Sequence, residues 1–479
     1  MILVQSGVVA GIEGFLIDVE VDVRPGLPGF EIVGLPSKTV RESRERVRSA
    51  LRNAGFKFPA QKVIVNLAPA HYPKDGALFD LPIALGVLAH QGVVPERVFQ
   101  DVIIAGELSL SGKIKRISGV LSLAQLAADC GFQIILPLEN RQEASLVESD
   151  RVLLVDSLGH LLSHLTGKAK TAQYPPSRPR ASKGLPKIAI KGQAQAKRAL
   201  EIASLGRHHI MLLGPPGVGK TLLATHARGL LPAPSYEEIL TINKVYEAAG
   251  LIGTKSTPMT ERPLRAPHHS ISQAGLIGSK KGKPGEITLA HLGVLLLDEF
   301  PEFNQGALQG LREPVDNRQV QISRAGFTLV YPADFWLIAT ANPCPCGYLG
   351  SSIRMCTCSG RDLNRYRRKL RGPLLDRLEI FAPLTPLSEQ ELRENPPPWP
   401  QKPAGRVKPG GQQNPGLSKA AEDFLHQAQE RLALSVRGFA STLKIAGTIA
   451  RLEGAPSITR AHMGEALQYR FESQRGLFL

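Results

Sequence analysis

The stretch that most constrains the fold of this chain is GPPGVGKT, residues 214–221. It follows the apolar run IMLL and precedes LLATHA, which is the strand–loop–helix context that a P-loop requires. Glycines let backbone N–H groups point inward and hold phosphate oxygens at the start of a helix. The pattern predicts an α/β domain that binds a nucleoside triphosphate through Gly214, Pro215, Pro216, Gly217, Val218, Gly219, Lys220 and Thr221.

A second apolar run, GVLLL, ends on the acidic pair Asp298 and Glu299. We expect Lys220 to contact the β and γ phosphates, and Thr221 and Asp298 to hold Mg²⁺. Glu299 would polarise the attacking water during hydrolysis. An acidic pair after a strand is a weak signal alone, but 78 residues after Lys220 it predicts a site that hydrolyses ATP.

A third apolar run, FWLIATAN, ends on Asn342. We expect this strand to end between the other two, where a side-chain amide could orient the hydrolytic water against the γ-phosphate. Four of the five cysteines follow directly, as CxC pairs at 344/346 and 356/358. Four thiolates suit tetrahedral Zn²⁺, although CxC is tighter than the usual C-x₂₋₄-C spacing. We predict a structural zinc site of Cys344, Cys346, Cys356 and Cys358, with free thiols as the alternative.

The rest of the chain divides by composition and periodicity. The expected parts are an α/β domain (1–167), a basic, proline-rich linker (168–186), the nucleotide-binding domain (187–384), a Pro/Gly-rich linker (385–416) and a small helical domain (417–479). The first residues lack a basic n-region, and no apolar run approaches the roughly 20 residues of a membrane span. We therefore expect no membrane partner and, with few clustered cysteines, a cytoplasmic protein.

The formal net charge is +16, from 58 Lys and Arg against 42 Asp and Glu. An excess of this size suits a polyanionic partner, and nucleic acid is the most frequent one. Net charge indicates what a protein associates with rather than how it folds. The alternative is a basic soluble protein without a polyanionic partner.

The three strand ends together resemble the AAA+ ATPases, and Asn342 occupies their sensor 1 position. GPLLDRLEI resembles the segment that carries the arginine finger, which implies Arg377 as the finger and a homo-hexameric ring. LSVRGFASTLK resembles the sensor 2 segment, with Arg437 reaching the nucleotide. The alternatives are that Arg377 pairs internally with Asp376 or Glu379 and that Arg437 is a solvated helix residue.

RPLRAPHHS, NPCPCGYLG and GPLLDR resemble the YifB/ComM family of magnesium-chelatase-like AAA+ proteins over essentially the whole chain. One departure is Leu264, where the family pattern has Phe, a conservative apolar change. The resemblance implies an ATP-driven helicase for branch migration in natural transformation, with recombination or DNA-uptake proteins as candidate partners. The alternative is a chelatase-like subunit that remodels a partner protein.

Basic side chains in the two insertions of this branch are candidates for DNA contact, although any one of them could be a solvated surface residue. They are Arg265, His268, Lys280, Lys281 and Lys283 before the acidic strand, and Arg324 in a hairpin after it.

The N-terminal domain resembles Lon-type proteases in PKDGALFDLPIALGVLA and in the segment around SGVLSLAQLAADCG. Leu78 then takes the position of the catalytic serine and Leu121 that of the lysine. A leucine has no nucleophilic atom and no lone pair, so we expect this domain to be non-catalytic.

Overall fold

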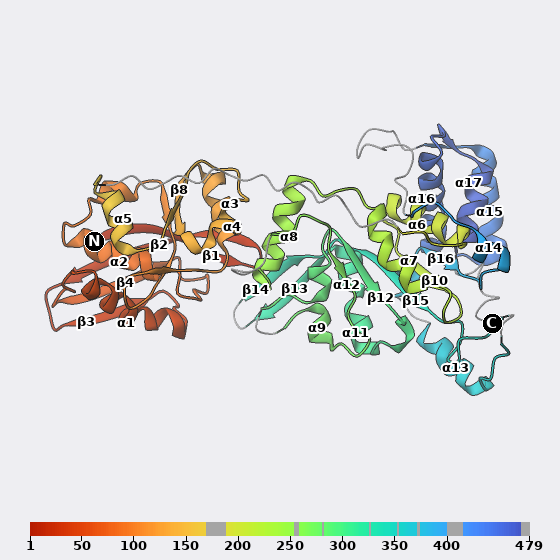
Figure 1. Cartoon of the computed structure of the whole chain (residues 1–479), viewed down its shortest axis with the longest axis horizontal. Helices are drawn as coiled ribbons and strands as arrows, with labels where there is room; N and C mark the ends of the chain where they lie inside the picture. The colour runs from red at the N-terminus through yellow and green to blue at the C-terminus, as the bar shows by residue number, and fades with distance from the viewer. Residues whose placement is uncertain are drawn as a thin grey trace. The chain divides into compact units, whose positions relative to one another are not determined.

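The computed structural model describes residues 1–168, 188–252, 258–279, 282–324, 327–351, 354–370, 374–399 and 415–470 (Figure 1). The chain forms two compact units, Met1–Arg180 with Ser235–Thr260, and Ala181–Pro234 with Glu261–Leu479. The five parts expected from the sequence stay a prediction. Residues 235–260, which follow the P-loop helix, join the first unit, and no motif or change of composition in the sequence indicated this.

The first unit is built on a seven-stranded mixed sheet with the order β3-β4-β2-β1-β5-β8-β9. β1 and β2 form an antiparallel hairpin, and β5, β8 and β9 run parallel. The strands are β1 (Ile2–Ala10), β2 (Glu13–Arg24), β3 (Gly29–Val33), β4 (Lys62–Ala68), β5 (Val102–Ile104), β8 (Gln133–Pro137) and β9 (Val152–Val155), beside a small pair, β6 (Glu107–Leu108) and β7 (Ile114–Lys115).

The helices of the first unit are α1 (Lys38–Asn53), α2 (Asp80–His90), α3 (Val120–Cys130), α4 (Arg141–Ala144) and α5 (Leu158–Leu165). α2 is buried from Asp80 to Ala89 because its sequence, DLPIALGVLAH, is apolar on almost every side. Leu78 and Leu121 are both buried in this core.

Helix α8 (Tyr236–Ala248) is the part of the 235–260 segment that docks on the first unit. Its Leu240 belongs to that unit's core, and the Tyr236 hydroxyl donates to the Leu146 carbonyl at 2.7 Å. The buried Glu247 carboxylate accepts the N–H groups of Val120 at 2.7 Å and Leu121 at 3.1 Å. These N–H groups begin α3, so Glu247 satisfies donors that a helix start leaves unpaired.

The second unit contains a five-stranded parallel sheet with the order β11-β12-β15-β10-β16. Its strands are β10 (Ile210–Leu213), β11 (Leu264–Arg265), β12 (Val294–Leu297), β15 (Trp336–Ala341) and β16 (Ile380–Pro383). β10, β12 and β15 are buried throughout, as parallel strands covered on both faces are. β15 lies between β12 and β10, which is the order expected from the sequence.

Helices and a hairpin complete the part of this unit that surrounds the sheet. They are α6 (Ala194–Gly206), α7 (Lys220–His226), α9 (Gln273–Ile277), α10 (Glu286–Leu289), α11 (Gln305–Gly310), α12 (Arg312–Asn317), α13 (Gly360–Lys369) and α14 (Glu389–Arg393), with the antiparallel strands β13 (Gln319–Arg324) and β14 (Phe327–Pro332). No helix in the described parts of the chain has both the length and the apolar character to cross a membrane.

The C-terminal helices α15 (Lys419–Leu432), α16 (Val436–Leu452) and α17 (Arg460–Gln468) form a small lid, drawn in blue in Figure 1, beside a short strand pair, β17 (Gly416–Leu417) and β18 (Ser457–Ile458). Leu200 of α6, Ile445 of α16 and Met463 of α17 share one apolar core.

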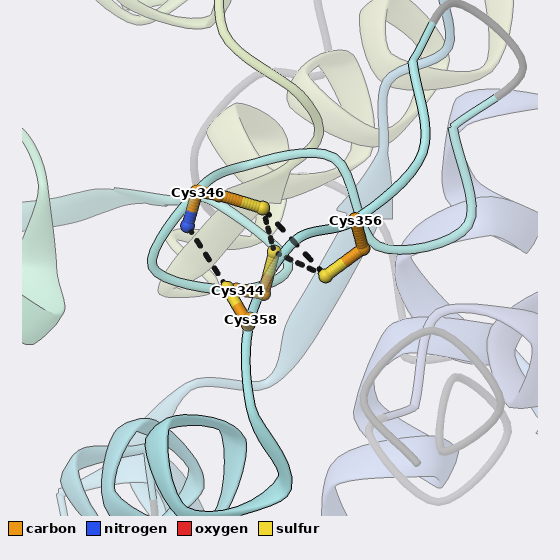
Figure 2. Close-up of side chains that lie close together, drawn as sticks. All are labelled: Cys344, Cys346, Cys356 and Cys358. Atoms are coloured by element: carbon orange, nitrogen blue, oxygen red, sulfur yellow. Dashed lines mark hydrogen bonds between the residues drawn. The ribbon is translucent and has the colours of Figure 1, made fainter.

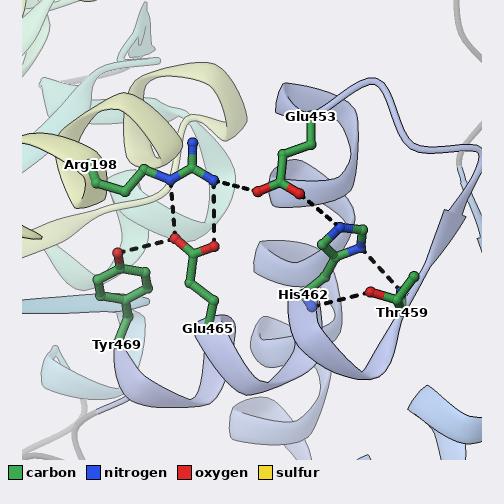
Figure 3. A network of polar contacts seen from close by, with 6 residues as sticks. All are labelled: Arg198, Glu453, Thr459, His462, Glu465 and Tyr469. Atoms are coloured by element: carbon green, nitrogen blue, oxygen red, sulfur yellow. Dashed lines mark hydrogen bonds and ion pairs between the residues drawn. The ribbon is translucent and has the colours of Figure 1, made fainter.

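A polar network also joins the lid to α6 (Figure 3). Arg198 donates to Glu453 at 2.8 Å and to Glu465 at 3.1 Å, and His462 Nε2 lies 3.1 Å from the other Glu453 oxygen. The lid is therefore fixed to the core by apolar burial and by charge.

Candidate nucleotide-binding and hydrolysis site

The P-loop connects β10 to α7 at the C-terminal edge of the parallel sheet. Gly217 and Gly219 have φ angles of 81° and 92°, so the turn uses left-handed backbone that favours glycine. The Lys220 ammonium donates to the carbonyls of Gly214 at 2.7 Å and Pro215 at 2.8 Å, and to Asn342 Oδ1 at 2.9 Å. Burial lowers the pKa of Lys220 to about 8, against the opposing effect of Asp298 and Glu299.

The acidic pair lies directly opposite the start of α7. The Thr221 hydroxyl is 3.0 and 3.2 Å from the two carboxylate oxygens of Asp298, so the two predicted Mg²⁺ ligands meet. Glu299 follows with a φ of 55°, and its side chain is 58% exposed. This left-handed backbone turns the chain away from the strand direction immediately after Asp298.

Thr340 is a site residue that the sequence analysis missed. Its hydroxyl donates to Asp298 Oδ1 and accepts the backbone N–H of Glu299 at 3.0 Å, so it fixes both acidic residues. The signal was present in the alternation of a strand, because residues two apart share one face. Thr340 and Asn342 are such a pair.

His269 is a second residue whose place the sequence did not reveal. Its Nδ1 lies 3.7 Å from Glu299 Oε2, and its ring is 4.1 Å from that of His268. His268 Nδ1 is 2.8 Å from the Ser270 hydroxyl. The predicted DNA-contact segment therefore brings one imidazole to the predicted catalytic carboxylate.

The structure brings Arg377 and Arg437 together on Asp316, a residue of α12. Arg377 donates through Nε to Asp316 Oδ1 at 3.0 Å and through Nη2 to Oδ2, and Arg437 Nη2 donates to Oδ1 at 2.8 Å. The Arg377 guanidinium is the main cause that lowers the pKa of Asp316. Glu379, one of the internal partners considered for Arg377, lies 2.7 Å from His208 Nδ1. The roles of the two arginines at a triphosphate stay predictions.

The four cysteines converge on one point (Figure 2). Their sulfur atoms all lie within 4.8 Å of one another, and three of the separations are 3.3, 3.6 and 3.7 Å. The backbone N–H of Cys346 donates to Cys358 Sγ and that of Leu349 to Cys344 Sγ, both at 3.3 Å. The expected cluster exists as geometry, and its occupant stays a prediction.

The predicted DNA-contact residues differ in their surroundings. Arg265 forms a bidentate pair with Glu286 at 2.6 and 2.7 Å, whereas Lys283 is exposed. Arg324 is the last residue of β13. Lys280 and Lys281 lie outside the described residues.

Three family models match the chain. They are magnesium chelatase, subunit ChlI, over residues 188–392, subunit ChlI of Mg-chelatase over 19–140, and magnesium chelatase, subunit ChlI C-terminal, over 410–470.

Curated relatives match at nearly full length. The chain is 38% identical to YifB of Escherichia coli (strain K12), over 98% of this chain and 96% of that protein. It is 37% identical to the competence protein ComM of Haemophilus influenzae (strain ATCC 51907 / DSM 11121 / KW20 / Rd), over 98% and 97%. Lon protease 2 of Bacillus subtilis (strain 168) is 28% identical over 36% of this chain and 35% of its own length.

These similarities and the parallel sheet confirm the predicted fold class, an α/β protein with a Lon-like N-terminal part, a P-loop ATPase module and a helical lid. The family models match the ATPase module and the C-terminal helices, and the two relatives match nearly the whole chain. The chain therefore belongs to the YifB/ComM family of magnesium-chelatase-like AAA+ ATPases.

Proposed function

We propose that this protein is an ATP-driven motor that acts on DNA as a homo-hexameric ring, in helicase or branch-migration steps of DNA uptake and recombination. The observation that carries the ATPase part is the meeting of Lys220, Asp298 and Asn342 at the ends of three neighbouring parallel strands. Ligands of open α/β sheets bind at this edge.

The geometry supports a separate role in ATP hydrolysis for each of these residues. Lys220 exchanges its carbonyl partners for phosphate oxygens, while Thr221 and Asp298 hold Mg²⁺, which supplies charge neutralisation when bound. Glu299 accepts a proton from the attacking water, and Asn342 orients that water. In a ring, Arg377 of one copy would neutralise transition-state charge in the pocket of the next copy.

Helix α13 and the overall charge support DNA as the substrate. The helix exposes Arg361, Arg365 and Arg368, while Tyr366 is buried and donates to the Asn342 carbonyl at 2.9 Å. Because this basic helix is bonded to the backbone of Asn342, phosphate contacts made by its arginines would act close to the hydrolysis site. The name of the Haemophilus relative, a competence protein, agrees with a role in DNA uptake.

A second candidate function is remodelling of a partner protein, which the matches to magnesium-chelatase subunits favour. ATPase measurements with and without single-stranded and branched DNA, over a range of salt concentrations, separate the two. A DNA motor shows stimulation by DNA that weakens steeply with salt, because phosphate contacts release counterions. Hydrolysis that ignores DNA, with no DNA retained at low salt, would favour the remodelling function.

We also propose that the four cysteines hold structural Zn²⁺. Four thiolates fill a tetrahedral shell and leave no open position for catalysis. The structure records these cysteines as unbridged thiols. The cytoplasm is the proposed compartment, because thiols stay reduced there.

A further inference from the structure

We propose that the four-cysteine site is a metal-dependent strut of the nucleotide pocket, so that metal occupancy sets nucleotide affinity. The inference rests on the proposed zinc site and on nucleotide binding, but it does not depend on DNA. It assigns to the metal a role in positioning the P-loop and Asn342, in addition to folding its own loop.

The sulfur separations are compatible with a tetrahedral metal site. A zinc–sulfur bond of about 2.3 Å places neighbouring sulfurs of a tetrahedron about 3.8 Å apart. The observed separations of 3.6 and 3.7 Å, from Cys356 Sγ to Cys346 and Cys344, are close to this edge. The two N–H groups that point at Cys344 and Cys358 are the kind of donor that stabilises metal-bound thiolates.

Within its described residues, the loop that carries the cysteines buries few side chains. Cys344 is buried, but Cys346, Cys356 and Cys358 are partly exposed, and the Met355 side chain is 88% exposed. A short loop that buries few apolar side chains lacks the hydrophobic energy to hold one conformation. Metal binding supplies that energy in small sites of this kind.

The first contact with the nucleotide pocket is made by Gly347, which follows the first cysteine pair. A Cβ atom added there would lie 2.6 Å from Pro216 Cδ, so the cysteine loop packs directly against the P-loop. The Gly347 N–H donates to the Cys344 carbonyl at 2.9 Å, which fixes this turn to a metal ligand. A shift of the cysteine loop would therefore move or release Pro216.

The second contact runs through Asn342, two residues before Cys344. Its side chain accepts from the Lys220 ammonium, and its carbonyl accepts from Tyr366. Tyr366 lies in α13, whose N-cap Ser359 directly follows Cys358. Metal ligands therefore flank the sensor residue on one side and begin the helix that holds it on the other.

The test uses purified full-length protein without DNA, with zinc measured by elemental analysis and affinity measured with a fluorescent ADP analogue. We expect about one zinc per chain. Cys358→Ser should lose the metal and bind ADP at least about tenfold more weakly. Cys130→Ser, at an exposed cysteine outside the site, should match the unsubstituted protein in both measurements. Chelation should weaken binding, and added zinc should restore it.

Substitutions at two glycines distinguish the effect of the Gly347–Pro216 contact from the effect of the metal. Gly347 and Gly350 both have positive φ, 86° and 72°, but a Cβ at Gly350 would meet nothing within 4 Å. Gly347→Ala should keep zinc and lose about tenfold in ADP affinity, while Gly350→Ala keeps both. The strut is refuted if metal-free protein binds ADP normally, if no metal is present, or if the two alanine variants behave alike. A protein that binds ADP but ignores DNA would refute only the proposed DNA function.

Discussion

Glu247 gives the sharpest prediction about the first unit, because its carboxylate ties α8 to the start of α3. Burial raises the pKa of Glu247 to about 7 from a usual 4.5, against the lowering effect of the Leu121 and Val120 N–H groups. Since the pKa is raised on folding, the stability from this group is full below about pH 4.5 and is lost as pH rises through about 7.

The magnitude follows from proton linkage. With a pKa of 4.5 when α8 is undocked and about 7 when it is docked, ionisation of Glu247 costs the docked state about 1 kcal/mol at pH 5.5 and about 3 kcal/mol at pH 8.5. Glu247→Gln cannot ionise, so it removes this cost at every pH. We therefore expect the free energy that docks α8 in the variant, relative to the unsubstituted protein, to rise by about 2 kcal/mol across that range.

Amide hydrogen exchange of the full-length protein measures this quantity for residues 236–248, after correction for the intrinsic pH dependence of exchange. Any constant cost of replacing the carboxylate cancels between the two pH values. Glu237→Gln, at an exposed carboxylate on the same helix, is the matched control and should follow the unsubstituted protein. Parallel pH dependences for Glu247→Gln and the unsubstituted protein would refute the reasoning.

Three further predictions concern hydrolysis and the lid. Glu299→Gln should bind ATP with unchanged affinity but lower kcat by a factor of about 10² or more, as measured by phosphate release, and normal turnover would require another base. Mixing the inactive variants Glu299→Gln and Arg377→Ala should restore part of the ATPase activity. In a mixed ring, a copy with Glu299 intact can face the intact Arg377 of a neighbouring copy. No recovery would count against pockets that two copies share. Asp316→Asn should destabilise the second unit by about 1–2 kcal/mol in thermal unfolding. This value is reduced because Asp316 and Arg437 are partly exposed to solvent. An unchanged unfolding midpoint would show that the carboxylate holds neither arginine.

The residues that the sequence located well are those that end a buried apolar run. Lys220, Asp298 and Asn342 each follow a strand whose burial can be read from four or more apolar residues. Parallel strands deliver their C-terminal ends to one edge, so local patterns were sufficient to predict their meeting.

The residues that the sequence did not locate depend on contacts between distant segments. Asp316 lies on a short polar helix, and only the folded chain shows that it meets Arg377 and Arg437. Glu247 lies on an ordinary amphipathic helix, and its partners are more than a hundred residues away. Neither position carries a periodicity or composition that distinguishes it from solvated acidic surface.

Residues 235–260 belong to the first unit although the second unit precedes and follows them in sequence, and this limits how the protein can be divided into fragments. The polypeptide passes between the two units three times, at 180/181, 234/235 and 260/261. A single protease cut in the basic linker would divide the chain into two fragments, and α8 would stay on the C-terminal fragment although it packs in the core of the first unit. A gene fragment that stops at the linker would also lack a helix that its product needs. The first unit is therefore complete only when residues from both sides of the linker are present, although each unit has its own core.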